Sequence, residues 1–258
     1  MSDDLLRPFL DRPDRAGIFL DFDGTLSEIV PVPSDAQPVA GAPELLAKLA
    51  RRYAVVAIVS GRSAHELVEW LGPDVEIWGV HGAQRTSNGE VTLAPRAAPF
   101  ADAMKAVHDE AAEAIRGLRL DGAIVEDKAV MVTLHYRAAT DPGRAERELE
   151  ALATELSERH GLTCVPGRSS FELRPAIDFT KAGVVRDRAP GLEAVAFAGD
   201  DTVDLPAFDA LDELGRDGVA TLRIAVRSEE APPELLERAD IVIDAPAGAI
   251  ELLRRLVP

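Results

Sequence analysis

The sequence predicts an α/β fold with a Rossmann-like parallel-sheet core and a second, α+β domain inserted into it. Near both ends of the chain, short apolar runs alternate with helical patterns, which is typical of parallel strands joined by helical crossovers. In the middle the order becomes helix, strand, strand, helix, strand, strand, which is typical of helices that cover one face of an antiparallel sheet. We therefore expect residues 1–94 and 175–258 to form the core and residues 95–174 to form the inserted domain.

The stretch of residues 18–26 begins with a short apolar run, which two carboxylates follow. It predicts a buried strand, and Asp21 and Asp23 lie two residues apart, so their side chains project to the same side of an extended chain. Gly24 permits a sharp turn directly after them. Two carboxylates this close repel each other unless a cation or a shared proton lies between them, and Mg²⁺ with oxygen ligands is the preferred cation.

Alternating helices and strands follow this motif. Pro43 favours a helix over residues 42–52. Further on we expect these elements, listed in order: a strand over 55–59 that ends at Ser60-Gly61-Arg62, a helix that reaches Leu71, a strand over 75–80 that leads to His81-Gly82, and a hairpin at Asn88-Gly89.

The inserted domain is predicted from two long helical patterns and four short apolar runs. We expect helices over 100–118 and 141–160, the second ended by Gly161, and strands over 123–126, 130–136, 162–165 and 171–173. The core pattern then resumes with a helix from Lys181, a strand over 194–198 that ends at Gly199-Asp200-Asp201, a helix over 206–215, strands over 222–226 and 241–243, and a helix over 249–256.

The composition is that of a globular protein, with 47% hydrophobic and 28% charged residues. The net charge of −17 argues against non-specific binding to nucleic acids and to anionic membranes. A single cysteine, Cys164, excludes an internal disulfide and suits a reducing compartment. Because we find neither a signal-peptide pattern nor an apolar run of membrane-spanning length, we expect a cytoplasmic protein. We also expect a monomer without nucleic-acid or membrane partners.

Four short polar segments resemble the motifs of the haloacid dehalogenase superfamily in order and spacing: D-x-D-G-T from Asp21, S-G-R from Ser60, Lys181, and G-D-D at residues 199–201. The resemblance implies a phosphoryl transfer in which Asp21 is the nucleophile and becomes an aspartyl-phosphate, while Asp23 is the general acid and then the base. It implies that Ser60 and Lys181 donate to the phosphoryl oxygens. It also implies a Mg²⁺ ion on Asp21, Asp200 and the main-chain oxygen of Asp23.

Each of these segments also has a purely structural explanation. Asp21 to Gly24 could be a turn closed by Asp and Gly after a core strand, and Ser60 could cap the following helix. Asp200 and Asp201 could form a turn, and Lys181 could be a solvated helix residue. The order of the four segments, each at a predicted strand end or helix start, favours the superfamily.

The inserted segment resembles the substrate-binding cap of trehalose-6-phosphate phosphatases. The resemblance lies in residues 125–128, 135–137 and 171–175, which precede Thr180-Lys181-Ala182-Gly183. It implies that Glu126, Lys128 and Glu172 hold sugar hydroxyls, although an exposed cross-strand ion pair is the structural alternative. Other residues that we expect at the substrate are Thr25, Gly61, Arg62, His81 and Arg137. For His81 a packed histidine, and for Arg62 a pair with a nearby acid, are the alternatives, and His135 and Arg137 could be structural in the inserted sheet.

The resemblance has departures. Asp204 falls where an acid that supports the metal is expected, together with Asp201, but Leu205 and Pro206 replace two acidic positions, and Gln84 stands where a charged residue is expected. The resemblance implies a Mg²⁺-dependent phosphatase that hydrolyses trehalose 6-phosphate. The alternatives are the same chemistry on sucrose 6-phosphate, on mannosyl- or glucosyl-3-phosphoglycerate, or on a trehalose-like pseudosugar phosphate. A phosphoacceptor signalling module is a more remote alternative, because such a module would lack the inserted domain, and a non-catalytic sugar-binding protein is a third.

Overall fold

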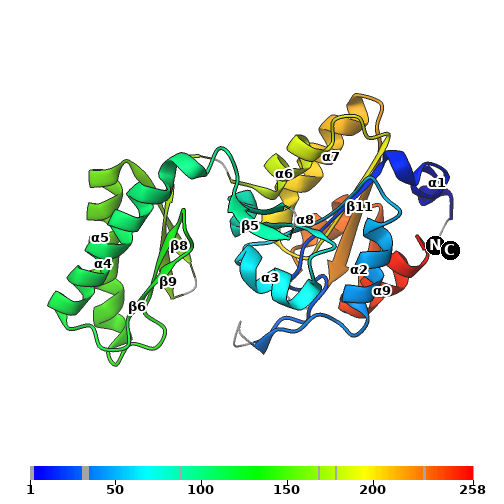
Figure 1. Ribbon diagram of the computed structural model, residues 1–258. Coiled ribbons are helices and arrows are strands. Elements are labelled where there is room, and N and C mark those ends of the chain that lie inside the picture. Colours follow the sequence, from blue (N-terminus) through cyan, green and yellow to red (C-terminus); the bar gives the residue numbers. More distant parts are fainter. Residues whose placement is uncertain are drawn as a thin grey trace. The chain divides into compact units, whose positions relative to one another are not determined.

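A computed structural model describes residues 3–30, 35–87, 89–167, 169–177, 179–228 and 231–257. The chain forms two compact units, one made of Met1–Thr92 with Phe179–Pro258 and the other of Leu93–Asp178 (Figure 1). The first unit is an α/β core and the second an inserted α+β layer, so the predicted fold class is confirmed. Among the helices in the described part of the chain, none has both the length and the apolar character needed to cross a membrane.

The core sheet has the strand order β12-β11-β10-β1-β2-β3-β4-β5. The strands from β12 to β3 are parallel, and β4 runs antiparallel to β3. Their bounds are β1 Ala16–Leu20, β2 Val55–Val59, β3 Glu76–Gly79, β4 Gln84–Ser87, β5 Glu90–Leu93, β10 Ala194–Gly199, β11 Ala220–Arg227 and β12 Ile241–Asp244. The predicted Asn88-Gly89 turn lies between β4 and β5, and Asn88 is outside the described residues.

Helices cover both faces of this sheet (Figure 1). On one face, leucines of α2, α3 and α9 pack against Ile18 and Ile58. Neighbouring strand residues point to opposite faces, so Phe197 of β10 lies on the other face. There Phe208 of α7 packs edge to face on Phe197. The core helices are α1 Arg7–Asp11, α2 Ala42–Ala50, α3 Ala64–Leu71, α6 Lys181–Arg188, α7 Leu205–Arg216, α8 Pro233–Arg238 and α9 Ala245–Arg254.

The third core strand is shorter than predicted. It ends at Gly79 because Val80 and His81 adopt left-handed backbone angles, with φ of 50° and 54°, followed by Gly82 at 103°. The Val80 N–H donates to the Arg62 carbonyl and the His81 N–H donates to the Ser60 carbonyl. A left-handed β-branched residue is strained, so these two bonds hold the backbone against its own preference.

The inserted unit has two helices on one face of a four-stranded antiparallel sheet of order β6-β7-β9-β8. Its elements are α4 Ala101–Leu118, β6 Ile124–Asp127, β7 Val132–His135, α5 Pro142–His160, β8 Leu162–Gly167 and β9 Ser170–Pro175. Val132 and Leu134 of β7 join the apolar core beneath the helices, so Thr133 and His135 point to the opposite face. Gly161 is left-handed and ends α5, as predicted.

Candidate active site

Polar residues follow three adjacent parallel strands. Asp21 comes directly after β1, Ser60 after β2 and Asp200 after β10. In the sheet register Leu20 of β1 pairs with Ile58 of β2 and with Ala198 of β10, so these strands end at nearly the same level. The carboxyl edge of an open parallel sheet is where ligands bind in such folds, and this edge is the candidate site.

Lys181 connects two carboxylates at this edge. It is the first residue of α6, and the preceding Thr180 caps this helix because its hydroxyl accepts the Gly183 N–H. Its Nζ lies 2.7 Å from Oδ1 of Asp21 and 2.6 Å from Oδ1 of Asp204, and only 2% of the side chain is exposed. Burial lowers the pKa of Lys181, but the two carboxylates outweigh burial and raise it. The ammonium is therefore a fixed positive charge beside Asp21.

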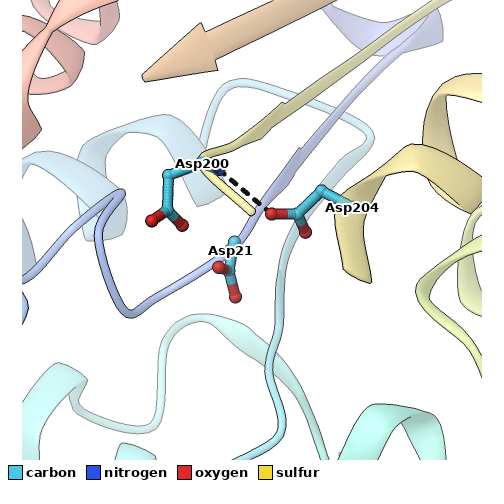
Figure 2. Close-up of side chains that lie close together, drawn as sticks. All are labelled: Asp21, Asp200 and Asp204. Carbon is cyan, nitrogen blue, oxygen red and sulfur yellow. Dashed lines mark hydrogen bonds between the residues drawn. The ribbon is translucent and has the colours of Figure 1, made fainter. Parts of the chain in front are cut away.

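Asp21, Asp200 and Asp204 form a buried acidic cluster in which one carboxylate oxygen of each lies within 4.8 Å of the others (Figure 2). Burial raises the pKa of Asp21, and Lys181 only partly offsets this rise. Burial and then the Asp204 charge raise the pKa of Asp200 to about 7. Three carboxylates around one ammonium leave excess negative charge, so the cluster suits a cation.

Asp204 is already engaged within the protein. Its Oδ2 accepts the backbone N–H groups of Asp200 and Asp201 at 3.0 and 3.1 Å, while Oδ1 contacts Lys181. Asp21 and Asp200 are the members of the cluster left to meet a ligand. An all-oxygen donor set of this kind fits a hard divalent cation such as Mg²⁺. Asp201 is exposed, and its carboxylate accepts the Thr202 N–H at the start of the following turn.

Gly24 lets the two acidic loops approach each other. It has a φ of +73°, and a Cβ at this position would lie 2.0 Å from Oδ2 of Asp200. Gly199 fills the same role on the other side, because its Cβ would lie 2.3 Å from Cγ of Asp204. Thr25 follows Gly24, and its buried hydroxyl has no hydrogen-bond partner among the described residues.

The S-G-R segment is folded back on itself. The Ser60 hydroxyl is buried and accepts the Arg62 backbone N–H at 3.2 Å. The Arg62 side chain pairs with Asp23 and with Glu66 of α3. Gly61 lies against His81, because a Cβ there would be 2.9 Å from the imidazole. The sequence left open whether Arg62 pairs with an acid, and the structure shows that it does.

Glu126 and Glu172, two of the expected sugar-binding residues, both pair with Thr133 in the inserted sheet. They therefore lie on the sheet face opposite to α4 and α5, here called the open face. Nζ of Lys128 lies 3.7 Å from Glu126 and 4.0 Å from Glu172. Glu126 also pairs with Nε2 of His135 at 2.8 Å, and that hydrogen bond lowers the pKa of Glu126. Arg137 lies two residues beyond β7.

Sequence reasoning missed the surroundings of two site residues. Gln84, which departs from the expected motif, is buried and accepts the Ala64 N–H at 2.8 Å, so it caps α3. Glu66 and Trp70 of α3 fix the Arg62 side chain. Arg62 lies two residues before α3, so its ion pair with Glu66 depends on how the chain enters the helix.

Comparisons with solved structures identify the fold. A haloacid dehalogenase-like hydrolase from Bacteroides thetaiotaomicron matches with a TM-score of 0.63 at 17% identity, over 94% of this chain and 99% of that one. A trehalose-6-phosphate phosphatase related protein matches with a TM-score of 0.73 at 24% identity, over 93% of this chain and 96% of that one. The fold is therefore that of the haloacid dehalogenase-like hydrolases.

The sequence comparisons identify the family. The trehalose-phosphatase family model matches residues 19–234. The trehalose-phosphate phosphatase of Mycobacterium marinum is 36% identical over 262 residues, which cover 96% of this chain and 64% of that protein. The chain belongs to the trehalose-phosphatase family, and it spans somewhat less than two thirds of the length of this relative.

Proposed function

We propose that the protein is a Mg²⁺-dependent phosphatase that hydrolyses trehalose 6-phosphate to trehalose and inorganic phosphate. The observation that carries the proposal is the contact of buried Lys181 with Asp21 at 2.7 Å, beside Asp200 at the carboxyl edge of the sheet. A carboxylate, a fixed cation and a second acidic loop are the parts that phosphoryl transfer needs. Family membership supports the substrate.

The proposed reaction begins at Asp21. Lys181 holds Oδ1 of Asp21, which leaves Oδ2 to attack phosphorus. The new bond from Oδ2 to phosphorus forms as the bond from phosphorus to the sugar oxygen breaks, and Asp23 gives that oxygen its proton. Asp23 then takes a proton from water, whose oxygen attacks phosphorus and releases the Asp21 carboxylate with inorganic phosphate.

The neighbouring groups stabilise the charge on the phosphoryl oxygens. Lys181 and Ser60 donate to these oxygens, and the Thr25 hydroxyl, which has no partner among the described residues, offers a further donor. The Mg²⁺ would be held by Asp21, Asp200 and the main-chain oxygen of Asp23, and when bound it neutralises the charge of the transferred group. Asp204 keeps the Asp200 loop in place through two backbone N–H groups, and Asp201 shapes the turn that follows.

The inserted unit, Leu93–Asp178, is proposed to act as the cap that selects the substrate. Glu126, Lys128 and Glu172 offer alternating acceptors and donors on one sheet face, which suits the hydroxyls of a disaccharide. Arg137 is assigned to the same sugar site. Gly61, Arg62 and His81 are assigned to substrate binding in the core unit.

A panel of phosphorylated sugars tests the proposal by release of inorganic phosphate with Mg²⁺ present. We expect trehalose 6-phosphate to give the highest kcat/KM, and the Asp21→Asn variant to lose at least about a thousandfold in kcat while it keeps the wild-type circular dichroism spectrum. Faster hydrolysis of sucrose 6-phosphate or a glycosyl-3-phosphoglycerate would refute trehalose 6-phosphate as the substrate and leave the proposed phosphatase reaction standing. Normal phosphate release by Asp21→Asn would refute the nucleophile.

A further inference from the structure

Arg62 holds the carboxylate of Asp23 with three hydrogen bonds. Nε of Arg62 donates to Oδ1 at 3.1 Å and to Oδ2 at 2.9 Å, and Nη2 donates to Oδ1 at 2.9 Å. The Asp23 side chain is 43% exposed, whereas that of Arg62 is 10% exposed. The partly exposed carboxylate of Asp23 is thus held by the almost buried guanidinium of Arg62.

The guanidinium itself is fixed by three groups. Nη1 of Arg62 donates to Glu66 at 2.9 Å. Its Cζ lies 5.0 Å from the ring centre of Trp70 and 5.7 Å from that of Phe22, and these two rings stack on each other at 5.3 Å. A cation over aromatic faces with a carboxylate at its far end has little freedom to turn. The orientation of Arg62 therefore determines the orientation of Asp23.

The two oxygens of Asp23 are not equivalent in this arrangement. A carboxylate has about four lone-pair positions, two on each oxygen. Oδ1 accepts two hydrogen bonds from Arg62 and Oδ2 accepts one. Oδ2 is left with a lone pair that can carry a proton while the contacts to Arg62 remain.

We propose that Arg62 is a positioning residue that presents Oδ2 of Asp23 as the atom that carries the transferred proton. The inference rests on the proposed phosphatase function. Asp23 gives the proton on Oδ2 to the sugar oxygen as the bond from that oxygen to phosphorus breaks, and later takes a proton from water onto the same oxygen. Arg62 keeps its hydrogen bonds in both steps and needs no contact with phosphate.

Leaving-group dependence tests this role. Trehalose 6-phosphate has an alkoxide leaving group that needs a proton, whereas p-nitrophenyl phosphate releases a stable phenolate that needs none. We expect Arg62→Gln to lower kcat/KM for trehalose 6-phosphate by about tenfold or more, and for p-nitrophenyl phosphate by less than about threefold, because only the first reaction uses general acid catalysis. Because kcat/KM covers the steps up to phosphoryl transfer, slow hydrolysis of the aspartyl-phosphate does not mask the difference.

Arg62→Lys serves as a second variant that keeps the positive charge in the site. A lysine ammonium lacks the planar fork of arginine, so we expect the same selective loss in a protein with unchanged far-ultraviolet circular dichroism. The matched control is Arg188→Gln, which removes hydrogen bonds of 2.8 and 2.9 Å to Glu76. Glu76 is the first residue of β3, at the amino end of the parallel strands, whereas Ser60 follows their carboxyl end. This variant should therefore keep the wild-type ratio of kcat/KM for the two substrates.

Equal losses on the two substrates, or no loss on either, would overturn the inference, since a structural or phosphate-binding Arg62 predicts one of these results. Failure of the proposed substrate looks different, because the wild type would then hydrolyse another sugar phosphate. The same ratio, measured with that sugar phosphate, then decides the role of Arg62. A wild type that hydrolyses no phosphate ester would overturn both.

Discussion

Asp204 is completely buried, and its Oδ1 accepts a hydrogen bond of 2.6 Å from Nζ of Lys181. Its Oδ2 meanwhile accepts two backbone N–H groups of the Asp200 loop. Both oxygens of this carboxylate thus face donors, so the residue joins α6 to the G-D-D loop. It acts as structural support for the two acids that we assign to the metal.

The Asp204→Asn variant should therefore be strongly destabilised. The amide of asparagine would turn its two hydrogen atoms toward groups that are themselves donors. It would also leave the buried ammonium of Lys181 with one carboxylate fewer. We therefore expect a loss of about 2–4 kcal/mol in the free energy of unfolding. Urea denaturation measures this. The neighbouring exposed Asp201→Asn keeps its acceptor for the Thr202 N–H and should lose less than about 0.5 kcal/mol. Similar stabilities for the two variants would contradict the support role.

Magnesium binding should depend on pH through Asp200, whose pKa in the metal-free protein is about 7. Below that value the ion must displace a proton, so its affinity should rise by about tenfold per pH unit and level off above pH 7. Because the folded pKa lies above the ordinary value of 3.8, the metal-free protein should also lose stability as pH rises toward 7. Titration calorimetry and thermal melting measure the two effects. Asp200→Asn should weaken Mg²⁺ binding and reduce the stability slope, leaving the part of that slope that comes from the raised pKa of Asp21.

Gly24→Ala should separate backbone strain from steric exclusion. The new Cβ would lie 2.0 Å from Oδ2 of Asp200, at a φ of +73°. Gly72, at a φ of +81°, has no heavy atom within 4 Å of such a Cβ. We expect both alanine variants to lose about 1–3 kcal/mol of stability. Only Gly24→Ala should also lose about a hundredfold in kcat, because it moves Asp200. Equal phosphatase activity in the two variants would show that the Asp200 position is not critical.

Lys128→Met should weaken binding of the sugar and leave phosphoryl transfer unchanged. Lys128 lies between Glu126 and Glu172 on the open face of the inserted sheet. We expect a KM for trehalose 6-phosphate about tenfold higher, from the loss of a charge-assisted hydrogen bond, and unchanged hydrolysis of p-nitrophenyl phosphate. Lys105→Met, which removes an exposed lysine of α4, is the control. An unchanged KM in Lys128→Met would favour a purely structural ion pair.

Much of this fold could be predicted because its signals are local. The apolar runs at 55–59 and 194–198 are too short and too apolar to be surface helices, and the structure has β2 and β10 there. Parallel strands that end together bring Asp21 and Asp200 to one edge whatever the intervening sequence. The placement of Lys181 beside these residues was implied by the resemblance to the superfamily's motifs, because Lys181 starts a helix and follows no strand.

The missed features depend on tertiary contacts. Helices α1 and α8 have five and six residues, too few to show a helical period. Val80 has a sequence preference for extended backbone, and main-chain bonds to residues far from it in sequence hold it and His81 in the left-handed conformation. The hold of Arg62 on Asp23 joins residues 39 positions apart, which no local pattern reveals.

The left-handed turn after β3 has a consequence for building chimaeras. Val80 and His81 are tied by main-chain bonds to the loop that carries Ser60, so a foreign inserted domain spliced in at these residues would let the turn relax and pull that loop away. Splices at residues 93 and 178, where the inserted unit begins and ends, leave the turn intact. New specificities should therefore be grafted at the second pair of junctions.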